Sequence, residues 1–83
     1  IQRWAENQTF IALGQMLIAA AIEGVDATPI GGFDEGILTE ELKLNEQGLI
    51  PSVIMTLGYR SENDFNAKLP KSRLKAEDVF TKL

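Results

Sequence analysis

The sequence predicts an α+β chain with a long helix, a short helix, one sheet strand and an extended C-terminal arm. Three features of its 83 residues lead to this prediction. Residues 10–22, FIALGQMLIAAAI, are apolar on nearly every side of a helix, leaving mainly Gln15 to face water. Residues 49–58, LIPSVIMTLG, are apolar without alternation, which is typical of a strand covered on both faces. From Tyr59 onward the chain is polar and rich in turn-forming residues.

The long helix is expected at Trp4–Glu23, with Gly24 as the left-handed residue that ends it. A chain of this size buries only about 60 to 65 per cent of its unfolded surface, so an all-round apolar helix needs cover from another chain or from further sequence. A membrane span is not predicted, because thirteen apolar residues fall short of the roughly 20 that cross a bilayer. Since the chain opens in mid-helix without Met, we interpret it as the C-terminal part of a longer polypeptide.

The middle of the chain is expected to hold short elements joined by loops. Pro29 favours extended backbone, so residues 26–30 are predicted to be a short extended stretch that ends at the permissive pair Gly31 and Gly32. Asp34 can then cap a second helix. The expected elements are this helix at Glu35–Leu44, a turn at Asn45–Gly48, a strand at Ser52–Gly58 and a short helix near Ala76–Phe80.

The sequence contains neither Cys nor His. Without Cys there is no disulfide, thiolate nucleophile or thiolate metal site, which is compatible with a reducing compartment, and we expect a cytoplasmic protein. Without His, neither a hydrolytic triad nor an ordinary zinc site can be assembled. Glu40 and Glu41 are consecutive, so they diverge by about 100 degrees on a helix and do not converge on one site. No catalytic side chain and no metal ligand are predicted, and any chemistry must come from a cofactor.

Positive charge is concentrated in the arm. We expect one domain over residues 1–83, with a core portion at 1–59 and the arm at 60–83. The arm segment KLPKSRLK holds four of the eight basic residues, although the net charge of the chain is -4. Lys71 and Arg73 are two residues apart, so in extended backbone they share a face and can hold one phosphate. From composition alone the alternative is favoured, namely a solvated basic arm that pairs with the acidic excess. Nucleic acid is not a predicted partner, because the cluster is short and the chain is acidic.

The segment ATPIGGFD is the second candidate site. Gly31 and Gly32 follow a proline, and without a Cβ their backbone N–H groups can approach a flat or anionic ligand. The same residues also suit a turn between an extended segment and a capped helix. Taken alone, this pattern favours the turn.

Three segments together resemble a known family. ATPIGGFD, VIMTLGYR and DFNAKLPKSRL are similar to the C-terminal part of the FMN-dependent nitroreductases, in the branch of the oxygen-insensitive NAD(P)H nitroreductases and dihydropteridine reductases. The resemblance implies that a loop lies against the FMN ring and that two cations of the arm hold its phosphate. Relatives commonly carry Glu at the position of Gly31, so only a backbone contact remains there. The residues so assigned are Pro29, Ile30, Gly31 and Gly32 for the ring, and Lys71 and Arg73 for the phosphate.

The resemblance also implies an activity and partners. It implies an α+β homodimer whose chain includes a further N-terminal part, and hydride transfer from NADH or NADPH through FMN to a small oxidised substrate, a nitroaromatic, a quinone or a pteridine. The alternative is a non-catalytic interaction segment that oligomerises through its exposed core helix. These two functions are distinguished by whether other sequence completes a flavin site.

Overall fold

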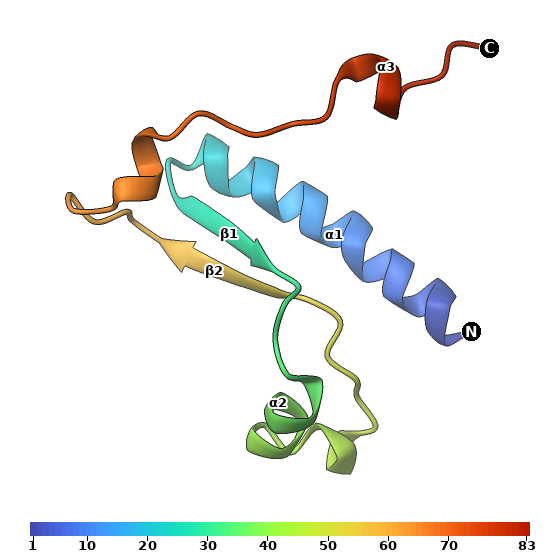
Figure 1. Cartoon of the computed structure of the whole chain (residues 1–83). Coiled ribbons are helices and arrows are strands. Elements are labelled where there is room, and N and C mark those ends of the chain that lie inside the picture. Colours follow the sequence, from blue (N-terminus) through green and yellow to red (C-terminus); the bar gives the residue numbers. More distant parts are fainter.

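The computed structural model describes residues 1–83 and has the α+β composition that the sequence predicts. A long helix and a two-stranded sheet form its centre, and the arm turns back beyond β2 and runs apart from them (Figure 1). In chain order the elements are α1 (Gln2–Ile22), β1 (Asp26–Ile30), α2 (Glu35–Glu41), the 3-10 turn η1 (Leu44–Gln47), β2 (Ile54–Gly58), the 3-10 turn η2 (Phe65–Lys68) and α3 (Ala76–Val79).

Helix α1 matches the predicted long helix to within two residues at its start and one at its end. Gly24 has φ +74, the left-handed backbone expected after the helix, and the Val25 backbone N–H donates to the Ala20 carbonyl at 2.9 Å. The chain then turns back, so that β1 packs along α1 (Figure 1). One long helix therefore supports one side of the small sheet.

Strands β1 and β2 pair antiparallel. Asp26 pairs with Gly58 at one end of the ladder, and Ile30 pairs with Ile54 at the other. The predicted extended stretch at 26–30 is therefore strand β1, and the predicted strand at Ser52–Gly58 enters the ladder only at Ile54. The sequence pattern of β2 predicts a strand that is covered on both faces. This chain does not provide that cover, since Leu57 is 57% exposed.

Helix α2 is shorter than predicted. The Asp34 carboxylate accepts a hydrogen bond from the Ile37 backbone N–H at 3.0 Å and caps the helix, as expected. The predicted end at Leu44 is wrong, because Lys43 adopts a left-handed φ of 52 and helix α2 stops at Glu41. The expected turn follows as η1, which Gly48 closes at φ +68.

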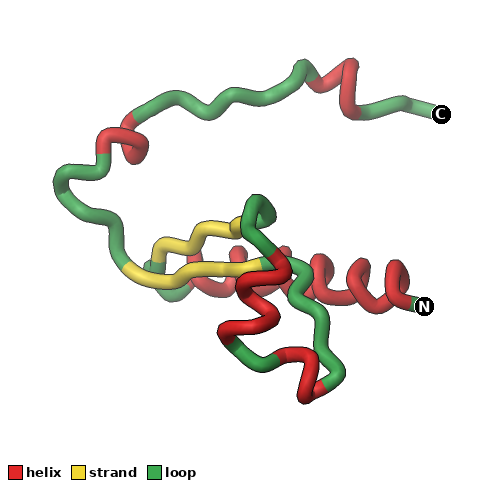
Figure 2. Tube along the Cα trace, turned by 60° about the horizontal axis from the view of Figure 1, so that its bottom comes forward, coloured by secondary structure: helices red, strands yellow, loops and turns green.

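The arm packs little against the rest of the chain. The substantial contacts between elements join β1 to β2, α1 to β1 and α2 to η1, and none involves η2 or α3 (Figure 2). Helix α3 lies inside the short helix predicted near the C-terminus but is only four residues long. The arm is therefore largely an extended segment, as the sequence predicts.

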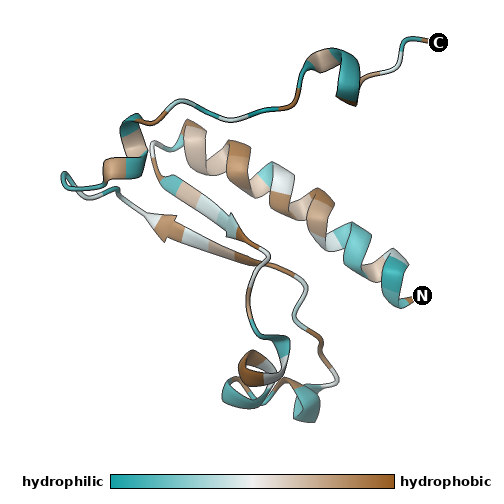
Figure 3. Ribbon diagram, viewed as in Figure 1, coloured by the Kyte–Doolittle hydropathy of each residue, from teal (hydrophilic) through white to brown (hydrophobic).

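No residue of the chain is buried. A compact monomer of this mass exposes about 4,900 Å², whereas this chain exposes 7745 Å². Figure 3 shows apolar residues along much of α1. These residues remain open, with Phe10 50% and Ile18 65% exposed. The chain cannot cover its own helix, as its length and composition predict. None of the helices combines the length and apolar character that crossing a bilayer requires.

Candidate functional site

The two predicted groups of site residues lie toward opposite ends of the sheet. Pro29 and Ile30 end strand β1, and the glycine loop follows them. The arm leaves from the other end, beyond Gly58, and Lys71 lines the same hollow as Asp26. Four residue steps along a strand span about 13 Å. A ligand that contacts both the glycine loop and the arm cations must therefore be elongated.

Neither glycine of the loop is required by the fold of this chain. Gly31 and Gly32 both lack a positive φ, so the permissive backbone that the sequence suggests is not used there. A Cβ built at either position meets no atom within 4 Å. Backbone conformation and internal crowding, the two usual reasons for glycine, are thus both excluded. The loop is therefore open at both glycines, and nothing within this chain fills that space.

The arm cations are not neutralised within this chain. Lys71 and Arg73 are exposed, and the single salt bridge of the chain involves neither. The Arg73 guanidinium donates from Nη1 only to the neighbouring Ser72 carbonyl, at 2.9 Å. The arm is therefore solvated, as the alternative expects, but its cations form no salt bridge with the acidic residues of this chain. Two cations remain available for an anion such as a phosphate.

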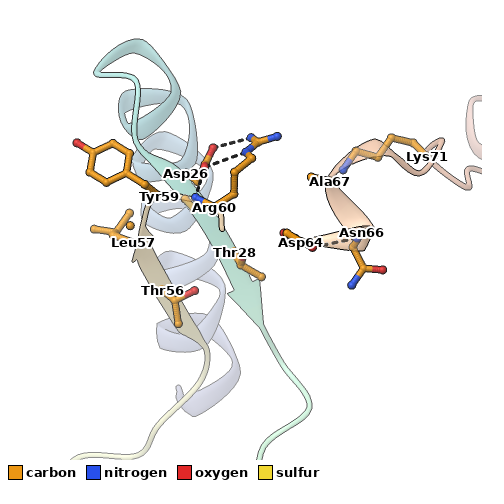
Figure 4. A pocket seen from close by; sticks show the side chains of 12 residues that line it. Asp26, Thr28, Thr56, Leu57, Tyr59, Arg60, Asp64, Asn66, Ala67 and Lys71 are labelled. Carbon is orange, nitrogen blue, oxygen red and sulfur yellow. Dashed lines mark hydrogen bonds and ion pairs between the residues drawn. The ribbon is translucent and has the colours of Figure 1, made fainter. Parts of the chain in front are cut away.

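A hollow of about 440 Å³ separates the sheet from the arm. Its walls are the start of β1, the end of β2 and the turn η2, and Figure 4 shows Lys71 on the arm side facing the sheet side. The charged groups around it are two carboxylates and two cations. They are Asp26, Arg60, Asp64 and Lys71. Of the predicted site residues only Lys71 lines this hollow, and Arg73 does not.

The sheet side of the hollow carries a tight ion pair that sequence reasoning missed. Asp26 Oδ1 accepts from Arg60 Nη2 at 2.6 Å, and Oδ2 accepts from Nε at 3.0 Å and from the Arg60 backbone N–H at 2.9 Å (Figure 4). These hydrogen bonds lower the pKa of Asp26 to about 2, and the carboxylate raises the pKa of Arg60. The pair follows from the register of β1 against β2, which no local sequence pattern reveals.

These features define an α+β chain with an open glycine loop and two arm cations that form no salt bridge within it. The chain belongs to the nitroreductase family, whose model matches residues 1–59. It is 42% identical over 79 residues to the oxygen-insensitive NAD(P)H nitroreductase of Enterobacter cloacae, covering 95% of this chain and 36% of that protein. The corresponding protein of Salmonella typhimurium is 41% identical over 81 residues, covering 98% of this chain and 37% of that protein.

A relative with a different name matches over nearly the same length. The major NAD(P)H-flavin oxidoreductase of Aliivibrio fischeri is 37% identical over 79 residues, covering 94% of this chain and 36% of that protein. The chain thus spans just over a third of the length of these relatives. The family predicted from the three sequence segments is confirmed.

Proposed function

We propose that the complete protein is an FMN-dependent oxidoreductase and that this chain supplies part of its flavin site. The observation that carries the proposal is the match to relatives named NAD(P)H nitroreductase, which extends through the arm as well as the core. Bound FMN would accept hydride from NADH or NADPH and pass two electrons to a nitroaromatic, a quinone or a pteridine. The residues of this chain bind and orient the flavin, and none of them is assigned a proton-transfer role.

The glycine loop is proposed to lie against the flavin ring. Pro29 and Ile30 end β1 and direct the chain into the loop, and the absence of a Cβ at Gly31 and Gly32 leaves their backbone N–H groups accessible. A backbone donor is fixed in direction and costs no side-chain entropy on binding. The loop therefore suits a rigid, planar ligand that is read by hydrogen bonds from the main chain.

Lys71 and Arg73 are proposed to hold the FMN phosphate. Arg73 can offer two parallel N–H groups to phosphate oxygens, and Lys71 adds a point charge. Both side chains are exposed and free of carboxylates. We assign the core portion at 1–59 to the ring side of the site and the arm at 60–83 to the phosphate side.

We further propose that α1 is covered by the remaining part of the polypeptide and by a second subunit, in a cytoplasmic homodimer. The surface in excess of a compact monomer is about 2,800 Å² on this chain alone, more than the roughly 800 Å² that one partner buries in a standard interface. Exposed apolar side chains along α1 support this proposal.

Intact mass and visible absorbance of the purified complete protein test the proposal together. We expect bound flavin with absorbance in the blue, released by denaturation as FMN, and NADH or NADPH oxidation that depends on an added quinone or nitroaromatic. A protein that stays colourless after incubation with FMN and oxidises neither nucleotide would contradict the proposal. That outcome would favour the non-catalytic interaction segment instead.

A further inference from the structure

The arm is joined to the sheet by the side chains of one residue pair, Asp26 and Arg60. Their hydrogen bonds link positions 34 apart in sequence. Every other side-chain hydrogen bond of the chain joins residues five or fewer apart. No helix or turn of the arm packs substantially on the core. The direction in which the arm leaves the sheet therefore depends on this contact.

A series of hydrogen-bonded turns runs from Ser61 to Leu69, between Arg60 and the cations of the arm. The Asp64 backbone N–H donates to the Ser61 carbonyl at 3.1 Å, and the Ala67 N–H donates to the Asp64 carbonyl at 3.3 Å. The Leu69 N–H then donates to the Asn66 carbonyl at 3.2 Å, and the Asp64 carboxylate caps this stretch. Consecutive turns fix the local backbone, so a change in the direction of the arm at Arg60 also moves the segment that carries Lys71 and Arg73.

We propose that the Asp26–Arg60 pair positions Lys71 and Arg73 for the FMN phosphate without touching the phosphate itself. The inference rests on the proposed function, since it needs the arm cations to bind FMN. Arg60 is a third cation near the hollow, but two N–H groups of its guanidinium already donate to the Asp26 carboxylate. The pair thus acts on phosphate binding through the position of the arm.

When the Asp26 carboxylate is removed, electrostatics and the position of the arm predict opposite changes in FMN affinity. Asp26→Asn deletes a negative charge beside an anion site and frees Arg60, so electrostatics alone predicts tighter FMN binding. Loss of the positioning pair predicts weaker binding, because the cations are no longer held in one place. The sign of the change therefore separates the two effects.

The experiment titrates FMN and riboflavin into the flavin-free complete protein and its variants. For Asp26→Asn we expect the Kd of FMN to rise about 3- to 10-fold and the Kd of riboflavin to stay unchanged, because riboflavin has no phosphate. In a Lys71→Ala/Arg73→Ala background the same substitution should have no further effect. Arg60→Lys keeps the charge and the backbone contact, so it should retain most of the FMN affinity.

Glu62→Gln is the matched control, since it removes one carboxylate charge from the arm without breaking a salt bridge. Its FMN affinity should be unchanged or slightly tighter. If Arg73→Ala weakens FMN selectively but Asp26→Asn does not, the positioning role is wrong and the proposed function stands. If Arg73→Ala shows no preference for FMN over riboflavin, the phosphate assignment fails and the positioning role fails with it. Should Asp26→Asn not fold, Arg60→Gln against Arg60→Lys decides in its place, with equal FMN affinity of the two overturning the proposal.

Discussion

Asp26 and Gly58 are partners at one end of the β1–β2 ladder, and this register places Arg60, two residues beyond Gly58, beside the Asp26 carboxylate. Arg60 donates from its side chain and from its backbone N–H, and the pKa of Asp26 falls from 3.8 to about 2. The contact that holds the start of the arm, at Arg60, therefore depends on the charge of one carboxylate.

We expect the Asp26–Arg60 contact to hold at neutral pH and to be lost in strong acid. A carboxyl whose pKa is lower in the folded state adds stability above its unfolded pKa, near 3.8, and this stability is lost as the pH falls toward 2. Carboxyl chemical shifts should show the Asp26 inflection near 2 and a higher inflection in Arg60→Gln. Asp64 and Lys71, the other charged groups around the hollow, are present in both proteins. An unchanged inflection in Arg60→Gln would rule out the guanidinium as the cause.

Gly32→Val should weaken flavin binding while the protein still folds. Within this chain Gly32 has no positive φ and no atom within 4 Å of a Cβ, so the chain leaves room for the side chain, which would occupy the space proposed for the ring. Flavin retention on a desalting column and the flavin reduction potential are the measurements. Unchanged retention, potential and turnover in a folded Gly32→Val variant would remove the loop from the site.

Gly24→Val is the matched control for the loop substitution. Gly24 has φ +74, so a β-branched side chain there should cost roughly 1–2 kcal/mol of stability. Its thermal midpoint should fall while the potential of any bound flavin stays the same. The opposite pattern at the two glycines separates a structural glycine from a ligand-facing one.

The isolated 83-residue chain should not remain monomeric. No residue is buried, and each Leu or Ile side chain removed from water contributes about 1.5–3 kcal/mol, so α1 favours association. Light scattering at micromolar concentration should give a mass above that of one chain. Ile11→Lys and Ile18→Lys, at positions 60% and 65% exposed, should shift the mass toward the monomer. A monomeric mass together with a cooperative melt of the unaltered chain would contradict this expectation.

Local structure was largely predictable from the sequence, and long-range structure was not. The long helix, the Gly24 stop and the Asp34 cap each depend on residues within one or two turns, and the structure agrees with all three. The early end of α2 was missed, because the left-handed backbone of Lys43 has no glycine to signal it.

The candidate site was likewise predictable only in its local features. The glycines and the arm cations stand out by residue type, and their assignment to FMN remains a prediction. The Asp26–Arg60 pair could not be found without the pairing of β1 with β2, since 34 residues separate its members. The separation of the ring loop from the arm cations also follows from that pairing, which the sequence leaves open.

Flavin titration of the flavin-free complete protein tests whether Lys71 and Arg73 bind the FMN phosphate. Arg73→Ala should raise the Kd of FMN by about 10- to 100-fold, and Lys71→Ala by less, because an ammonium offers no two-pronged contact. Lys75→Ala removes the same charge from the same arm and should have little effect. Riboflavin affinity should be the same in all four proteins. If Arg73→Ala weakens riboflavin as much as FMN, or if Lys75→Ala matches Arg73→Ala, the phosphate assignment is wrong.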